Sequence, residues 1–202
     1  MFGSIARSYD LVNSVLSFGV HHYWRKVLLS LIEIENPQSG LDVCTGTADL
    51  LPPLSKRCSE VVGLDFCLPM LELGAQKIKS DASCSNVQLV QGDALSLPFS
   101  ENSFDLITVA FGVRNFEDLD RGLSEMKRVL RPGGQVLVLE FGQPKNFLWK
   151  KIYELYSKAF MPIIGGLLSG NKQAYTYLPK TAKEFPCGKD FMARLAALSL
   201  IH

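Results

Sequence analysis

The sequence lacks the features that mark several specialised classes of protein. Its 21 Lys and Arg residues nearly balance 20 Asp and Glu, and a net charge of +1 offers no general attraction for nucleic acid. The longest apolar run, residues 160–168, contains a proline and two glycines and falls well short of the roughly 20 residues of a membrane span. The first residues show no basic segment followed by an apolar block, so we expect no signal peptide.

Cysteine and histidine are too few and too scattered for a disulfide framework or a metal centre. The five cysteines never form a Cys-x-x-Cys pair, which indicates small residues in a reducing compartment, and we expect a cytoplasmic protein. Of the three histidines, His21 and His22 are adjacent, so ligands at a useful spacing are missing and we expect no metal.

What the chain does contain is an alternation of short apolar strands and helices. With 47% hydrophobic and 20% charged residues, its 202 residues can bury the core of a single domain. Near-continuous apolar strands between helices are typical of a parallel sheet covered on both faces, so the pattern predicts a Rossmann-like α/β fold. The predicted strands are 40–44, 60–64, 87–91, 105–111 and 135–141, and the predicted helices are 9–16, 22–31, 51–57, 68–79, 118–130, 147–160 and 189–200.

The first strand leads into a turn of small residues. Ligands of an open parallel sheet bind at the carboxyl ends of its strands, so Asp42, Gly46 and Thr47 are candidates for a site. Backbone N–H groups in such a turn can approach a ligand closely. No Gly-Lys-Ser/Thr follows, which excludes a P-loop, and the three-glycine fingerprint of a nicotinamide-dependent oxidoreductase is missing. Taken alone, the turn fits a plain strand–helix connection at least as well.

Two carboxylates follow the next two strands. Asp65 lies 23 positions after Asp42, where an acid can bind the paired hydroxyls of a ribose. Asp93 and Ala94 can bind an adenine through the carboxylate and a backbone N–H. The alternatives are a cap of the following helix for Asp65 and an ordinary turn residue for Asp93. Together the three strand ends predict a ligand with an amino-acid carboxylate, a ribose and an adenine, and S-adenosylmethionine fits that description.

With these residues in place, the chain resembles the ubiquinone/menaquinone biosynthesis C-methyltransferase family over nearly its whole length. The most specific stretches are Tyr9-Asp-Leu-Val-Asn13, Leu16-Ser-Phe-Gly19 and Phe111-Gly-Val-Arg114-Asn115. The first loop is similar to that of the menaquinone branch. The resemblance implies S-adenosylmethionine-dependent C-methylation of a polyprenylated quinol ring, from demethylmenaquinol to menaquinol. A non-catalytic S-adenosylmethionine-binding or scaffold protein on the same fold is the alternative.

The resemblance also implies roles for individual residues. Cys44 and Ala48 replace two of the three glycines of the usual methyltransferase loop, which predicts a weaker hold on the cofactor. A serine contact of some members falls on Ala110, so that contact should be absent or made by backbone. The implied cofactor-binding positions are Gly46, Thr47, Asp65, Asp93 and Ala94, together with Asp42 of the first strand.

A quinol carbon becomes nucleophilic as its hydroxyl loses a proton, so the reduced ring should be the substrate. We expect Arg114 to stabilise the developing oxyanion and Asn115 to orient the hydroxyl or a water. The alternative for Arg114 is an ion pair with an acid such as Asp118. The residues expected in a lid over the substrate are Tyr9, Asp10, Asn13, His22 and Trp24.

We expect one domain with three functional segments: a helical lid in 1–36, a cofactor-binding core in 37–145, and a substrate-side helical segment in 146–202. In the last, Phe147, Trp149, Tyr153 and Tyr156, near several lysines, fit a groove for the quinol tail or a peripheral contact at the inner face of the membrane. A helix packed on the sheet, or on a second subunit of a homodimer, fits equally well.

The end of the chain carries one more expectation. Methyltransferases of this fold usually finish their sheet with two further strands, for which the helix at 189–200 leaves no room. We therefore expect five strands, all parallel, with one edge left bare. The segment 147–168, a partner subunit or nothing would cover that edge.

Overall fold

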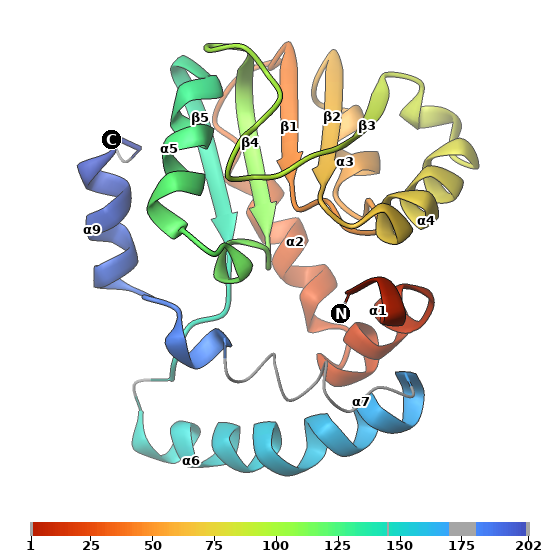
Figure 1. Ribbon diagram of the computed structural model, residues 1–202, viewed down its shortest axis with the longest axis vertical. Coiled ribbons are helices and arrows are strands. Elements are labelled where there is room, and N and C mark those ends of the chain that lie inside the picture. The colour runs from red at the N-terminus through yellow and green to blue at the C-terminus, as the bar shows by residue number, and fades with distance from the viewer. Residues whose placement is uncertain (1, 145, 170–180, 201–202) are drawn as a thin grey trace.

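A computed structural model describes residues 2–144, 146–169 and 181–200, and a parallel sheet forms its centre (Figure 1). Within these ranges the sheet has five strands in the order β3-β2-β1-β4-β5, and every neighbouring pair is parallel. The order reverses between β1 and β4, which makes their carboxyl ends the topological switch point. The predicted fold class and strand number are confirmed. The strands are β1 (Ser39–Val43), β2 (Glu60–Asp65), β3 (Val87–Gln91), β4 (Phe104–Ala110) and β5 (Leu130–Leu139).

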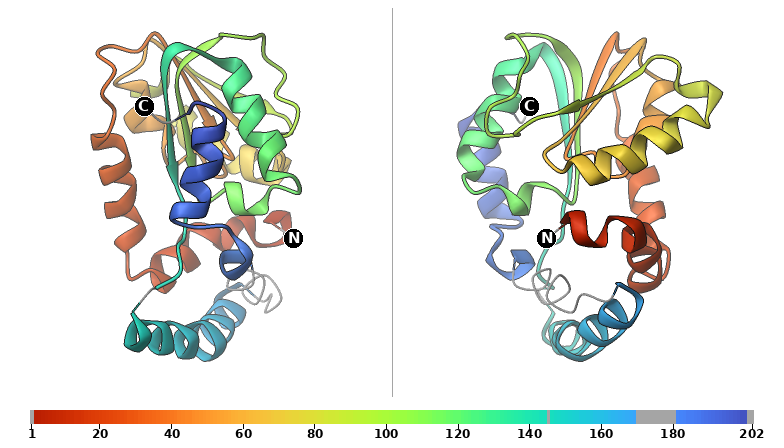
Figure 2. Two further views of the ribbon diagram at one scale, coloured as in Figure 1. Left: turned by 90° about the vertical axis from the view of Figure 1, so that its left-hand side faces the viewer. Right: turned by 45° about the vertical axis from the view of Figure 1, so that its right-hand side comes forward.

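Helices cover both faces of this sheet and also its lower end (Figures 1 and 2). One face carries α2 (Val20–Ser30), α3 (Leu51–Ser55) and α4 (Leu68–Lys79), and the other carries α5 (Leu119–Val129). Short 3-10 turns span Ala82–Cys84 and Val113–Asn115. Across the carboxyl ends of the strands lie α1 (Phe2–Leu16), α6 (Phe147–Leu155), a π-helical turn (Tyr156–Phe160) and α7 (Met161–Ser169).

The alternation of side chains along the strands builds a core on each face. In β4, Leu106 packs with the α2 and α3 cluster, whereas Ile107 and Val109 pack with Leu123 and Met126 of α5. Successive side chains of a strand point to opposite faces, which explains why the central strands are apolar almost throughout. A third, smaller cluster joins α1 to α7 away from the sheet.

The strand β5 contains an irregularity near its start. Residues 131–134, the Arg-Pro-Gly-Gly stretch, lie within β5 and bulge from it, because Phe104 pairs with Leu130 while Leu106 pairs with Gln135. Four residues therefore stand opposite Asp105 alone. Proline has no N–H to donate to a ladder, which is the physical reason for a bulge at this position.

The edge of the sheet at β5 is covered differently from what the sequence suggested. The helix α9 (Lys189–Ala197) lies beside β5 and α5 in both views, and its side chains Leu195 and Leu198 pack against the α5-side core (Figures 1 and 2). The segment 147–168, named above as one cover, lies below the sheet instead and packs on α1. The alternative that this segment forms a helix packed on the sheet is therefore wrong as well.

We predict that α9 protects the β5 edge. Leu195→Asp places a charge in a partly buried apolar contact, so the free energy of unfolding should fall by about 1–3 kcal/mol and self-association should increase. Urea denaturation and light scattering measure the two effects. Met192→Asp on the exposed side of the same helix is the matched control. Equal behaviour of the two variants would show that α9 leaves the edge unprotected.

Candidate functional site

The loop after β1 keeps the backbone of a glycine-rich turn although it contains a single glycine. Cys44, Gly46 and Ala48 have φ of 58°, 56° and 67°, all in the left-handed region. For a residue with a Cβ this conformation costs roughly 1–2 kcal/mol. The three positions where the resemblance implies glycine thus all have a φ that favours glycine, although two of them carry a side chain.

Two glycines outside the loop make room for the added side chains. A Cβ on Gly112 would stand 2.5 Å from the Cβ of Cys44, and one on Gly74 would stand 3.0 Å from the Cβ of Ala48. Gly46 itself faces open space, since a Cβ there would meet no atom within 4 Å. The loop is thus tightly packed on two sides and open at its tip.

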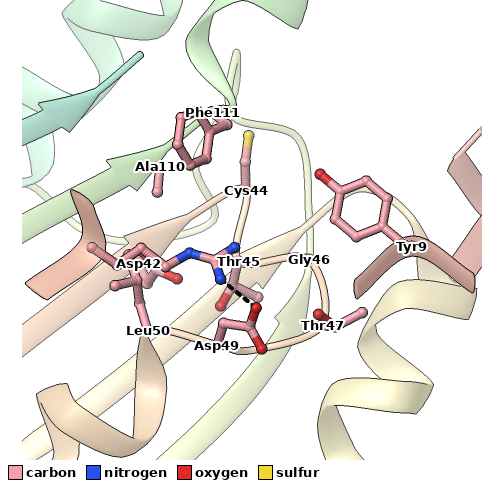
Figure 3. A pocket seen from close by; sticks show the side chains of 11 residues that line it. Tyr9, Asp42, Cys44, Thr45, Gly46, Thr47, Asp49, Leu50, Ala110 and Phe111 are labelled. Carbon is pink, nitrogen blue, oxygen red and sulfur yellow. Dashed lines mark hydrogen bonds and ion pairs between the residues drawn. The ribbon is translucent and has the colours of Figure 1, made fainter. Parts of the chain in front are cut away.

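A small pocket of 30 Å³ lies at the switch point, between this loop and the end of β4 (Figure 3). Its walls include the Tyr9 ring from α1, Arg25 from α2 and the start of the loop after β4 at Ala110 and Phe111. A volume of this size holds about one or two water molecules. Residues from four separate elements therefore converge here, among them three of the predicted cofactor-binding residues, Asp42, Gly46 and Thr47, and one expected lid residue, Tyr9.

Asp42 is a buried carboxylate beneath the loop. The Thr108 hydroxyl of β4 donates to its Oδ1 at 2.6 Å. Burial raises its pKa to about 6, against the opposing effect of the hydrogen bond from Thr108. The charged form is thus costly in the folded protein, and the hydrogen bond offsets part of that cost.

Asp65 and Asp93 lie at the carboxyl ends of the adjacent strands β2 and β3. Asp65 accepts hydrogen bonds from the backbone N–H groups of Gly46 and Cys67, both at 2.8 Å, and burial raises its pKa. Asp93 is exposed and accepts from its own turn, while Ala94 is buried. Neither acid lines the small pocket. The sequence analysis missed the neighbouring Phe66, which is 75% exposed and offers an apolar surface beside Asp65.

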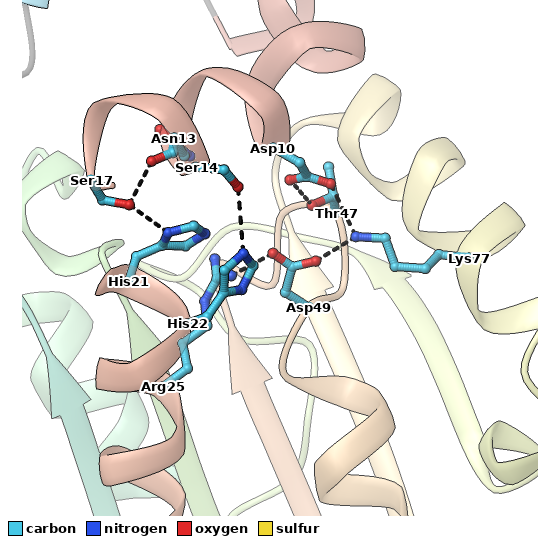
Figure 4. Close-up of polar contacts among 10 residues, drawn as sticks. All are labelled: Asp10, Asn13, Ser14, Ser17, His21, His22, Arg25, Thr47, Asp49 and Lys77. Atoms are coloured by element: carbon cyan, nitrogen blue, oxygen red, sulfur yellow. Dashed lines mark hydrogen bonds and ion pairs between the residues drawn. The ribbon is translucent and has the colours of Figure 1, made fainter. Parts of the chain in front are cut away.

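A network of two carboxylates and two cations joins α1 to the loop (Figure 4). Lys77 of α4 donates to both Asp10 and Asp49, and Arg25 of α2 pairs with Asp49 at 2.5 Å. The Thr47 hydroxyl donates to Asp10 at 2.7 Å. Asp10, which the sequence analysis placed in a lid, therefore holds α1 against the loop. It does so partly through Thr47, which was predicted to bind the cofactor.

A second pocket of 890 Å³ adjoins the first, and Tyr9, Arg25 and Phe111 line both. It is enclosed by α1, the turn after it, α2, the ends of β4 and β5, and α6. Of the expected lid residues, Tyr9, Asn13 and Trp24 line this pocket. Its polar walls include Tyr9, Asn13, Ser17, His21, Arg25, Arg114, Glu140, Tyr153 and Tyr156.

Arg114 lies in the wall of the larger pocket in a buried ion pair. Its Nη1 donates to Glu140 at 2.7 Å, and the two side chains are only 5% and 4% exposed. The Phe111 carbonyl also accepts from Nη1, and the guanidinium stands 5.3 Å from the centre of the Phe141 ring. Asp118, the partner suggested by the sequence, instead caps α5 by accepting from the Arg121 N–H.

The predicted residues Asn115 and His22 also lie outside both pockets. The side chain of Asn115 lines neither, and its Oδ1 is buried without a hydrogen-bond partner among the described residues. His22 is exposed and contacts Ser14 at 3.4 Å, while its neighbour His21 lines the larger pocket. The helical phase of α2 is the signal that separates these two histidines, because Trp24 lies one turn after His21 and on the same face.

Flat aromatic side chains form the floor between the two pockets. The rings of Phe111 and Phe141 stack with centres 4.7 Å apart, and Trp24 contacts both at 6.3 and 6.1 Å. Such a surface suits a planar aromatic ligand. In the described part of the chain, no group of three or more His, Cys, Asp or Glu side chains is placed to hold a metal ion.

The residues around the small pocket fit S-adenosylmethionine chemically. Asp65 retains acceptor capacity for ribose hydroxyls beside the exposed Phe66 ring, and the open tip at Gly46 lets a ligand approach the backbone. The two cations that reach the loop, Arg25 and Lys77, are both already paired with Asp49, so a phosphate group finds no free partner in either.

Comparisons with known proteins agree with this geometry. Residues 1–199 match the ubiE/COQ5 methyltransferase family. The demethylmenaquinone methyltransferase of Staphylococcus epidermidis is 45% identical over 189 residues, which cover 92% of this chain and 77% of the relative. The enzyme of the same name from Thermus thermophilus is 43% identical over 199 residues, with coverage of 98% and 90%.

Solved structures show the same fold. The YcgJ protein of Bacillus subtilis has a TM-score of 0.58 at 26% identity, covering 65% of this chain and 56% of that one. A SAM-dependent methyltransferase from Aquifex aeolicus has a TM-score of 0.55 at 23% identity, with coverage of 61% and 66%.

The buried Asp42 predicts an unusual dependence of stability on pH. In the folded state the Asp42 carboxyl takes up a proton as the pH falls through about 6, whereas in the unfolded chain it does so only near its ordinary pKa of 3.8. Protonation of Asp42 therefore stabilises the folded state as the pH falls through this window. Asp42→Asn removes that gain, at most about 3 kcal/mol. Relative to wild type, the variant's free energy of unfolding should therefore fall between pH 6 and 4, as measured by urea denaturation.

The control for losing one carboxylate is Asp190→Asn at an exposed position of α9. If both variants differ from wild type by the same amount at every pH, Asp42 does not titrate in this window.

Proposed function

Since the chain belongs to the ubiE/COQ5 methyltransferase family, we propose that it transfers the methyl group of S-adenosylmethionine to a ring carbon of demethylmenaquinol. The chain is an S-adenosylmethionine-dependent C-methyltransferase of menaquinone biosynthesis, and its substrate is a quinone-type ring. The observation that carries the finer proposal is the pairing of a loop pocket at the switch point with a larger aromatic pocket that shares its walls. A nicotinamide-dependent oxidoreductase finds no support in these relatives.

The cofactor-binding residues that we propose lie on the loop and at the strand ends. Gly46 and Thr47 would hold the amino-acid end above Asp42, Asp65 the ribose, and the Asp93–Ala94 turn the adenine. α1 lies against the loop, where the small pocket has a volume of only 30 Å³, and we propose that α1 moves away to admit the amino-acid end. The contacts that this movement breaks are those of Asp10 with Thr47 and Lys77.

Once bound, S-adenosylmethionine supplies an electrophilic methyl group, and the chain's own residues supply alignment and charge. Positioning of two reactants can lower a barrier by several kcal/mol, on the order of 7–11 in favourable cases. We propose that the aromatic floor orients the quinol ring and that Arg114 stabilises the oxyanion. Its Nε is buried without a hydrogen-bond partner among the described residues, while Glu140 restrains Nη1. The proposed roles of Asn115 in orienting a hydroxyl and of His22 in a lid remain predictions.

We also propose a division of the chain by task. Residues 1–36 and 146–202 form the substrate side, and residues 37–145 hold the cofactor. The wall composition of the larger pocket supports this division, because most of its lining comes from residues within 1–36 and 146–202.

The proposal is tested by methyl transfer from labelled S-adenosylmethionine to a short-tailed demethylmenaquinone under anaerobic conditions. The reduced ring should react and the oxidised ring should not, because only the quinol can place electron density on the ring carbon. Asp65→Asn should raise the KM for S-adenosylmethionine roughly tenfold with little change in kcat, since it removes a charged acceptor. Equal rates with reduced and oxidised rings would contradict the mechanism, and cofactor binding without transfer would support the non-catalytic alternative.

The finer proposal about partners concerns the membrane. Among the described residues, no helix is both long and apolar enough to cross a bilayer. The helix α6 nevertheless has no buried residue, and Phe147, Leu148 and Trp149 are 71%, 64% and 63% exposed. Lys150 and Lys151 directly follow these three residues in α6. We define this α6 face by its exposed apolar residues, Phe147, Leu148, Trp149, Ile152 and Leu155.

A bilayer with anionic headgroups is the occupant that best matches the α6 face. Its two lysines complement such headgroups, and the face is continuous with the substrate pocket, because Trp149 and Ile152 belong to both. Phe18 and Val20 on the turn after α1 are likewise exposed and line the pocket. A polyprenyl tail that leaves the pocket would therefore emerge into lipid.

We predict binding to vesicles that contain phosphatidylglycerol, weaker binding to pure phosphatidylcholine, and a loss of binding in Trp149→Ser. Flotation measures the bound fraction. Leu31→Ser is the matched control, because Leu31 is an exposed apolar residue at the amino end of the sheet. Absence of vesicle binding together with a dimer in sedimentation would identify the α6 face as an interface between two copies of the chain instead.

A further inference from the structure

His21 is a buried histidine in the wall of the larger pocket that the mechanism so far leaves without a task. It lies near the start of α2 and is only 5% exposed. Its Nδ1 is 2.6 Å from the Ser17 hydroxyl oxygen (Figure 4). The same hydroxyl is 2.7 Å from the backbone carbonyl of Asn13.

These two contacts determine the tautomer of the imidazole. A carbonyl oxygen can only accept, so the single proton of the Ser17 hydroxyl is donated to Asn13. Toward His21 the hydroxyl oxygen must then accept, which requires the proton of the neutral ring to be on Nδ1. The lone pair of the ring is consequently on Nε2.

The surroundings keep this ring neutral. Burial is the main cause that lowers the pKa of His21, to about 4, and the charge of Arg25 and the neighbouring His22 act in the same direction. Asp49 in the loop and Asp10 on α1 oppose them. At neutral pH the imidazole is therefore an acceptor, and an oxyanion that forms opposite it would favour its protonation.

From this geometry we propose that Nε2 of His21 accepts the proton of the substrate's ring hydroxyl during methyl transfer. The inference rests on the proposed function and adds the proton acceptor that Arg114, permanently charged, cannot be. His21 and Arg114 line the same pocket, and Trp24, one helical turn from His21, packs on the aromatic floor beside Arg114.

The step balances as follows. The substrate O–H bond breaks, its proton moves to Nε2, and the oxygen electron pair conjugates into the ring. The ring carbon forms a bond to the methyl carbon as the carbon–sulfur bond breaks, with its electron pair remaining on sulfur. The ring carbon then loses its hydrogen as a proton to water, and His21 returns its proton to the ring oxygen.

The first test compares His21→Gln with wild type in the methyl-transfer assay with short-tailed demethylmenaquinol. A lost proton acceptor should lower kcat by roughly a hundredfold or more, while calorimetry should show unchanged affinity for S-adenosylmethionine. Lys26→Gln, an exposed position on the same helix, controls for the change of helix surface. A His21→Gln variant with wild-type kcat overturns the inference, whereas an inactive wild type overturns the proposed function.

The second test does not depend on activity or on the folding of that variant. Nitrogen-15 spectra of the wild-type imidazole should show a protonated Nδ1 and a bare Nε2 at neutral pH, and Ser17→Ala should shift the ring toward a mixture of tautomers. The same Ser17→Ala variant should lose part of kcat while its ring remains in place. A wild-type ring protonated on Nε2 overturns the assignment.

Discussion

The parallel pairing of β1 with β4 is the constraint on which the site depends. Residues Gly40 to Val43 pair in register with Leu106 to Val109, so both strands end at the same level of the sheet. The chain must leave that level in opposite directions, which opens the space between the loop after β1 and the segment after β4. Because the core clusters on both faces clamp these two strands, the walls of the small pocket are held by the most buried part of the molecule.

Three pairs of polar groups lie within this apolar frame. Thr108 bonds Asp42, Glu140 pairs with Arg114, and Ser17 bonds His21, each where an unpaired group would be costly. A buried ion pair is a weak source of stability, since desolvation of the two charges offsets most of their attraction. What these pairs provide is orientation: each holds one functional group at a fixed place in the wall of a pocket.

The carboxyl end of the sheet is closed by helices that make few contacts with the sheet itself. α1 is held to the loop by ionic contacts and to α7 by a small apolar cluster, and α6 has no buried residue. Ionic contacts that remain partly exposed contribute little free energy, about 0–1 kcal/mol each. The part of the molecule that must admit two substrates is thus its most weakly attached part, while the cofactor loop rests on the rigid core.

Local pattern in the sequence was sufficient for the fold class, the strands, most of the helices and the small-residue loop, because periodicity of 2.0 or 3.6 and strand-end acids are short-range properties. The prediction missed α7 and the first turns of α1. The helical phase of α2 could have favoured His21 over His22 from the sequence alone. That the carboxyl ends of the predicted strands lie together at one edge of the sheet could also be argued from the sequence, because the strands of a parallel sheet all run in the same direction. The partner of Arg114 could not: Glu140 lies 26 residues away and meets it only because β4 and β5 are neighbours. Likewise, the bulge in β5 and the place of α9 at the sheet edge depend on long-range packing. These were decided by the tertiary structure, since each depends on which surfaces come together and not on the order of residues along the chain.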